Sequence, residues 1–132
     1  MPKLTVDGRV AEVPEGQRLV LAIEGQGIPI GHRCGGFARC TTCRVQFLEG
    51  EPETMTRAEY AILKTRDLLG QARLSCQIVC DHDMAVHPLL TKDNNPSWDT
   101  TGPAPQPTVT PEAEWFPKDQ VEREAAQQTP QT

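Results

Sequence analysis

Residues 34–43 read Cys-Gly-Gly-Phe-Ala-Arg-Cys-Thr-Thr-Cys, and this stretch decides the fold. Its cysteines, Cys34, Cys40 and Cys43, are separated by five and two residues, and Cys76 follows after a further 32. Three thiols on one irregular loop and a fourth on a distant predicted strand form a ligand set suited to a metal cluster. The adjacent pair Gly35-Gly36 favours a tightly wrapped loop, because glycine has no Cβ and accepts positive φ.

The spacing favours a [2Fe–2S] cluster over other cysteine sites. A structural zinc module brings two close ligand pairs, and here only Cys40–Cys43 is such a pair, so zinc is the less favoured alternative. A thioredoxin-like dithiol at Cys40 and Cys43 would need its first cysteine at the N-terminus of a helix, which lowers the pKa of the thiol. Residues 44–48 instead alternate like a strand. We therefore predict that Cys34, Cys40, Cys43 and Cys76 hold one cluster.

The charge around these cysteines is predicted to tune the cluster. Arg33, Arg39 and Arg44 lie beside the ligands in sequence. A cluster held by four thiolates is negative, so neighbouring cations raise its reduction potential.

The fifth cysteine, Cys80, is predicted to be a free, buried thiol. Cys80 is four residues beyond Cys76. If the predicted strand continues to Cys80, the two residues lie roughly 13 Å apart at ~3.3 Å per residue. That separation excludes a disulfide with Cys76 and a shared iron. Cys80-Asp81-His82 resembles half of a Rieske site, but no second half follows.

The first 92 residues predict an α+β domain. An Asp7-Gly8 pair between short apolar runs indicates a β-hairpin. A short helix over 19–23, a strand over 44–48 and a helix from Thr56 to Leu69, begun by a Thr-x-x-Glu capping box, follow. Strands over 73–79 and 84–86 complete a curved sheet packed against a helix.

Residues 93–132 differ sharply from this domain. They contain seven prolines, 7 acidic residues and 2 basic ones, whereas residues 1–92 contain 11 of each charge. Such a segment buries too little apolar surface to offset its ordering entropy, so we predict a disordered tail. The domain is expected to end at residue 92.

The composition also limits location and partners. The N-terminus resembles neither a signal nor a transit peptide, and no apolar stretch approaches the roughly 20 residues of a membrane helix. We therefore predict a cytoplasmic protein. Because the cytoplasm keeps thiols reduced, its cysteines are expected to be metal ligands or redox groups and not disulfides. No basic stripe with interleaved aromatic residues supports nucleic-acid binding.

Residues 34–43, together with Arg73-Leu74-Ser75-Cys76-Gln77-Ile78, resemble the [2Fe–2S] ferredoxins over roughly residues 3–90. The five-residue first gap is closer to the adrenodoxin and putidaredoxin branch than to the plant type. The resemblance implies a β-grasp fold, four cysteine ligands and one-electron transfer. It also implies partners such as a flavoprotein ferredoxin reductase and an acceptor such as a cytochrome P450 or other oxygenase. We expect the chain to be a monomer.

The chain departs from that branch in its second predicted helix. In the adrenodoxin and putidaredoxin branch, the helix that follows the cysteine loop presents a cluster of acidic residues to basic partners. Residues 56–69 offer only Glu59 and Asp67, against Arg57, Lys64 and Arg66.

Two functions are consistent with these features. The sequence shows no acid–base pair, nucleophile or nucleotide-binding loop, so we predict an electron carrier and not an enzyme. The alternative is a regulatory or redox-sensing module that acts through the tail.

Overall fold

The computed structural model describes residues 2–33, 35, 41–95, 97–98, 101–102, 105–109 and 115–117. Its largest sheet has five strands in the order β2-β1-β8-β4-β6. These strands are β1 (Lys3–Val6), β2 (Arg9–Glu12), β4 (Arg44–Glu49), β6 (Arg73–Leu74) and β8 (Met84–Pro88). The pair β1–β8 is parallel and the other pairs are antiparallel, so the sheet is mixed.

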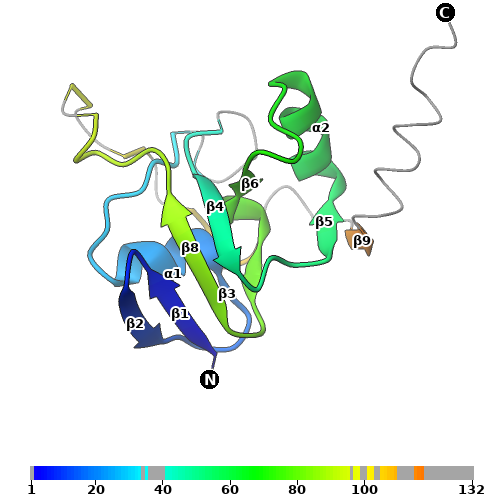
Figure 1. Cartoon of the computed structure of the whole chain (residues 1–132). Coiled ribbons are helices and arrows are strands. Elements are labelled where there is room, and N and C mark those ends of the chain that lie inside the picture. The colour runs from blue at the N-terminus through cyan, green and yellow to red at the C-terminus, as the bar shows by residue number, and fades with distance from the viewer. Residues whose placement is uncertain are drawn as a thin grey trace, which may run out of the picture.

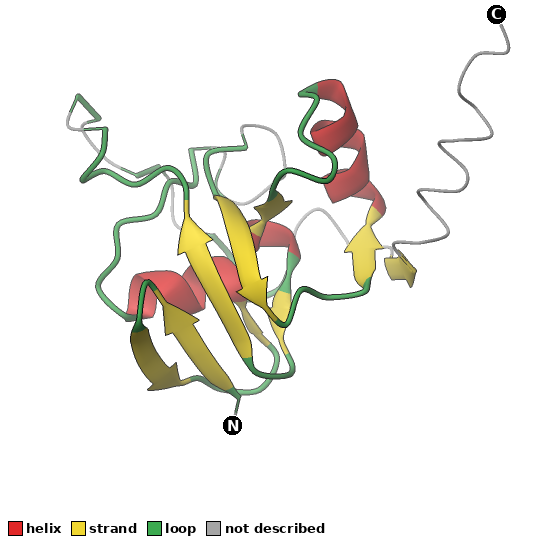
Figure 2. Ribbon diagram, viewed as in Figure 1, coloured by secondary structure: helices red, strands yellow, loops and turns green. Residues whose placement is uncertain are grey.

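Helix α1 (Leu19–Gly25) covers one face of this sheet (Figures 1 and 2). Its apolar side chains are buried in one core with strand residues such as Leu4, Val6 and Val86. The arrangement confirms the predicted α+β fold. None of the described helices has the length and apolar character needed to cross a membrane.

The N-terminal hairpin forms as predicted. Strands β1 and β2 pair antiparallel, and the residues between them, Asp7 and Gly8, have φ of 49° and 86°. A two-residue turn with positive φ at both positions matches the right-handed twist of the flanking strands.

The predicted strand over 73–79 is wrong in its middle. The chain forms β6, a 3-10 turn η1 (Ser75–Gln77) and then β7 (Val79–Cys80), which pairs with β3 (Gln17–Arg18). The two strands therefore belong to different sheets, and Cys76 lies on the turn that joins them.

Helix α2 (Arg57–Thr65) begins as predicted but ends earlier. The Thr56 hydroxyl accepts the Glu59 N–H at 3.1 Å, which is half of the expected capping box. At the other end Asp67 has φ of 58°, and the Leu68 N–H donates to the Leu63 carbonyl at 2.8 Å. This Schellman-type ending terminates the helix before Asp67, whereas the sequence predicted that the helix continues to Leu69.

A buried ion pair fastens α2 to β6. The Glu59 carboxylate is fully buried and accepts from Arg73 Nε at 2.8 Å, from Arg73 Nη2 at 3.1 Å and from the Leu74 N–H at 2.9 Å. Burial alone lowers the pKa of the Arg73 guanidinium, but the Glu59 charge and its hydrogen bonds outweigh that effect and raise it. Because these donors all meet the same carboxylate, the pair locks the helix to the sheet.

Several of the described residues after residue 92 contact the domain. We call residues 97–98, 101–102 and 105–109 the C-terminal strap. Its Gln106 and Thr108 carbonyls accept from Arg18, and its Thr101 carbonyl accepts from the His32 N–H. Further on, β9 (Trp115–Pro117) pairs with β5 (Thr54–Thr56). These hydrogen bonds to Arg18 and His32 hold the segment against the domain, although it buries little apolar surface.

We expect Glu59→Gln to lower the free energy of unfolding by about 3 kcal/mol, because it leaves the buried Arg73 charge without its main counterion. Urea unfolding followed by circular dichroism measures the change. Glu12→Gln, which alters an exposed glutamate on β2, is the matched control and should change stability by less than about 0.5 kcal/mol. Equal stabilities of the two variants would show that the pair does not fasten the helix.

Candidate metal centre

Cys43 lies immediately before β4, at the end of a tightly turned segment. Thr41 is 1% exposed with φ of 57°, a left-handed conformation that needs support in a non-glycine residue. Arg44 supplies that support, since its Nε donates to the Thr41 carbonyl at 2.9 Å and its Nη2 to the Thr41 hydroxyl at 2.8 Å. The side chain of Arg44 therefore shapes the loop in addition to carrying a charge beside it.

Cys76 lies on η1, which two hydrogen bonds fasten to Cys43. The Ser75 N–H and the Ser75 hydroxyl both donate to the Cys43 carbonyl, at 3.1 Å and 2.7 Å. Cys43 and Cys76 are 2% and 0% exposed. Two predicted ligands that are 33 positions apart are thus held on adjacent, buried backbone.

A chain of side-chain contacts connects the Cys76 sulfur to α2. Gln77 Nε2 donates to Cys76 Sγ at 3.6 Å, and the Thr56 hydroxyl donates to Gln77 Oε1 at 2.7 Å. Both Gln77 and Thr56 are buried, and Thr56 also caps α2. An N–H directed at a ligand sulfur stabilises negative charge on it and is one of the factors that set a cluster's reduction potential.

The other two predicted ligands, Cys34 and Cys40, lie outside the described residues, as does Arg39. Residues that flank them form turns. The Gly35 N–H donates to the His32 carbonyl at 2.8 Å, and Gly35 has φ of 71°, as expected for a wrapped loop. In the part of the chain that is described, no three metal-ligating side chains gather.

The described residues fit a thiolate-held cluster. Two buried sulfurs lie on fastened backbone, one of them receives an amide N–H, and neither cysteine forms a disulfide. A buried pair of thiols with a directed N–H group suits a negative iron–sulfur group.

Cys80 is a free, buried thiol, as predicted, although the geometric reason for excluding it as a ligand was wrong. The chain from Cys76 to Cys80 is not one extended strand, so its length does not separate them. Cys80 instead lies on β7, where it pairs with Gln17 of β3. Burial, with a smaller contribution from the Asp81 charge, raises the pKa of this thiol to about 12. It therefore remains protonated at neutral pH.

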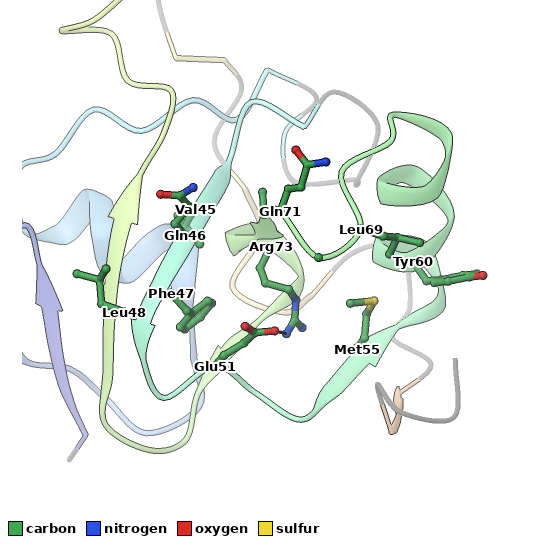
Figure 3. Close-up of a pocket in the computed structure, with 12 residues that line it drawn as sticks. Val45, Gln46, Phe47, Leu48, Glu51, Met55, Tyr60, Leu69, Gln71 and Arg73 are labelled. Carbon is green, nitrogen blue, oxygen red and sulfur yellow. Dashed lines mark hydrogen bonds and ion pairs between the residues drawn. The ribbon is translucent and has the colours of Figure 1, made fainter. Parts of the chain in front are cut away.

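A hollow of about 410 Å³ lies between β4 and α2 (Figure 3). Phe47 and Tyr60 contribute to its walls. Two of its lining residues are charged, and they form an ion pair in which Arg73 Nη1 lies 3.3 Å from Glu51 Oε2. Of the predicted ligands that the structure describes, neither Cys43 nor Cys76 lines this hollow.

Two residues that contact Cys76, Gln77 and Arg18, were not predicted from the sequence. Gln77 was within the quoted motif, but its contact with sulfur depends on the turn η1, which the predicted strand did not contain. Arg18 is fully buried and donates to the Cys76 carbonyl at 2.7 Å. An isolated arginine before a short helix carries no sequence signal for such a role.

Comparison with known proteins identifies the domain. Residues 4–81 match the family described as 2Fe-2S iron-sulfur cluster binding domain. The chain is 34% identical over 98 residues to the 2Fe-2S ferredoxin of Escherichia coli K12, in a match that covers 65% of this chain and 88% of that protein.

Solved structures show the same fold. The ISC-like [2Fe-2S] ferredoxin FdxB of Pseudomonas putida has a TM-score of 0.55 at 25% identity, over 66% of this chain and 91% of that one. The Amycolatopsis cytochrome P450 reductase GcoB has a TM-score of 0.53 at 25% identity, over 66% of this chain and 26% of that one.

Some relatives are much longer than this chain. One component of the Na(+)-translocating NADH-quinone reductase of Methylococcus capsulatus is 34% identical over 79 residues, which is 60% of this chain and 19% of that protein. The chain thus spans about a fifth of that relative's length. With the family match over more than half of its own length, the chain belongs to the [2Fe–2S] cluster-binding ferredoxin family, whose cofactor is one [2Fe–2S] cluster and whose members carry electrons.

Proposed function

We propose that Cys34, Cys40, Cys43 and Cys76 hold the cluster and that the chain passes single electrons from a flavoprotein ferredoxin reductase to an acceptor such as a cytochrome P450 or other oxygenase. The observation that carries this proposal is the pair of bonds from Ser75 to the Cys43 carbonyl, which brings the two described cysteine segments together. When bound, the cluster supplies one-electron chemistry. Hydrogen bonds fasten the backbone at Cys43 and Cys76, which limits the reorganisation that accompanies each transfer.

The relatives support the proposed partners. GcoB is described as a cytochrome P450 reductase, and the Methylococcus protein as part of an NADH-quinone reductase. In each, a region similar to this chain is part of a larger reductase. We infer that a reductase of this kind donates electrons to this chain, and that the chain acts as a monomer.

The cluster domain is proposed to lie within residues 1–92, with 93–132 as an acidic extension. The family match over 4–81 supports this division. A cytoplasmic location is proposed because Cys80 is a free thiol, which a reducing compartment preserves.

The exposed surface of α2 supports a partner with an acidic docking face. Glu59, the acid in its first turn, is buried against Arg73 and adds no charge to the surface. Lys64 and Arg66 are exposed near its end, against one exposed acid, Asp67. Opposite charges on two partners steer their encounter and raise the association rate.

Serine replacement tests the ligands. We expect Cys43→Ser and Cys76→Ser to lose the visible absorption of the cluster or change it strongly, because serine oxygen is a poor ligand for it. Cys80→Ala is the control and should retain the absorption and a reversible one-electron reduction. A colourless wild-type protein with one bound zinc would refute the cluster ligand set. A cluster that decomposes on every reduction would favour the sensing alternative.

The pKa of Cys80 predicts a dependence of stability on alkaline pH. Its value of about 12 exceeds the usual value of 9.0, so the unfolded chain loses this proton first. The stability associated with Cys80 is therefore complete below pH 9 and is lost as the pH rises towards 12. Urea unfolding of wild type and Cys80→Ala between about pH 8 and 10.5 should show a steeper decline in the wild type. Parallel declines would contradict the assignment.

Charge reversal tests the docking face. The double variant Lys64→Glu with Arg66→Glu should slow electron transfer from the reductase at low salt, by roughly tenfold, and the difference should shrink as salt screens the charges. Lys3→Glu with Arg9→Glu, on the exposed hairpin, is the matched control. Equal rates for the two double variants would exclude α2 as the docking surface.

A further inference from the structure

Arg18 is a buried cation beside the proposed cluster ligand Cys76. It is the last residue of β3 and is 0% exposed. Its Nε donates to the Cys76 carbonyl at 2.7 Å. A guanidinium removed from water is costly unless its N–H groups meet acceptors, so the position requires fixed oxygen atoms around it.

The C-terminal strap supplies two of those acceptors. Arg18 Nη1 donates to the Gln106 carbonyl at 3.0 Å and to the Thr108 carbonyl at 3.2 Å. The strap residues are 88 and 90 positions away in sequence, yet they share one side chain with the turn that carries Cys76. Pro105 and Pro107 lie beside these carbonyls in sequence and restrict the backbone, because proline fixes φ.

A second part of the strap lies against the chain that leads to Cys34. The His32 N–H donates to the Thr101 carbonyl at 2.8 Å. A Cβ on Gly102 would lie 2.5 Å from the His32 carbonyl oxygen, and one on Gly31 would lie 2.9 Å from the Trp98 ring. The strap thus contacts backbone near two of the proposed ligands at separate points.

We propose that Arg18 is a positioning residue for the cluster and that the C-terminal strap sets the reduction potential through it. The proposal rests on the role of Cys76 as a ligand. Arg18 fixes the Cys76 carbonyl, while Gln77 contacts the Cys76 sulfur. The strap holds the guanidinium in place and keeps water from it, so its charge acts through a medium of low dielectric.

The direction of the effect follows from charge. The cluster becomes more negative when it accepts an electron, and a nearby buried cation stabilises that reduced form. A well-seated strap therefore raises the potential. Release of the strap hydrates Arg18, weakens its field at the cluster and lowers the potential.

The first test compares Arg18→Gln with Arg9→Gln in the full-length holoprotein. Both variants remove one positive charge, but Arg9 is exposed on the edge strand β2. We expect Arg18→Gln to shift the reduction equilibrium about tenfold towards the oxidised form, which is ~59 mV for one electron. Arg9→Gln should shift it less than about twofold, and Arg18→Lys should recover part of the loss. If Arg18→Gln does not retain its cluster, Arg18→Lys is compared with Arg9→Lys.

The second test loosens the strap without shortening the chain. Pro105→Gly with Pro107→Gly increases the backbone freedom of the strap. This double variant should lower the potential in the wild-type background and leave it unchanged in the Arg18→Gln background, since the strap acts through the arginine. In the Arg18→Lys background, which keeps the charge, it should lower the potential by less than in the wild type. Non-additivity of this kind is the signature of two coupled sites.

The outcomes separate this inference from the proposed function. Equal potentials for Arg18 and Arg9 variants, or additive effects of the strap and Arg18 changes, would overturn the inference while the cluster and its ligands stand. A Cys76→Ser protein whose absorption and potential match the wild type would overturn the ligand assignment on which the inference rests.

Discussion

The bonds from Ser75 to the Cys43 carbonyl are the contact on which the proposed metal centre depends. A cluster with four ligands requires its sulfurs at fixed separations, but the chain between Cys43 and Cys76 includes the strands β4, β5 and β6 and the helix α2. Any movement of those elements would separate the ligands unless the two ends were fastened directly. The Cys43 carbonyl, which accepts two hydrogen bonds from Ser75, provides that link beside the proposed ligands Cys43 and Cys76.

The intervening elements then reinforce the link. Glu59 joins α2 to β6 through Arg73, and Thr56 joins the start of the same helix to Gln77 beside Cys76. The helix therefore meets the cluster-bearing turn at two points through hydrogen bonds to buried groups. Buried polar networks of this kind are costly when any member is lost, because each partner is then left without its acceptor or donor. Their rigidity suits a protein whose task requires the same geometry in both oxidation states.

Local signals in the sequence predicted much of this structure. The Asp7-Gly8 turn and the helix cap at Thr56 each depend on a few neighbouring residues, and both formed, although the Glu59 side chain bonds to Arg73 and does not complete the capping box. The strand over 73–79 failed because its residues are shared between two sheets, and the turn at Cys76 is held by the contact of Ser75 with a residue 32 positions earlier. The strap was missed for a similar reason, since its partners are Arg18 and His32. Two of the four predicted ligands, Cys43 and Cys76, lie on backbone segments that hydrogen bonds join, and the choice of these cysteines as ligands remains a prediction from their spacing.

Charge counted along the sequence is a poor guide to charge at the surface of this protein. Glu59 and Arg73 cancel each other in the interior, and Arg18 is hidden beneath the strap. What remains on α2 is mainly basic, although the chain as a whole carries a net charge of −5. Because encounter rates depend on the local field and not on the total, a partner meets α2 as a basic surface.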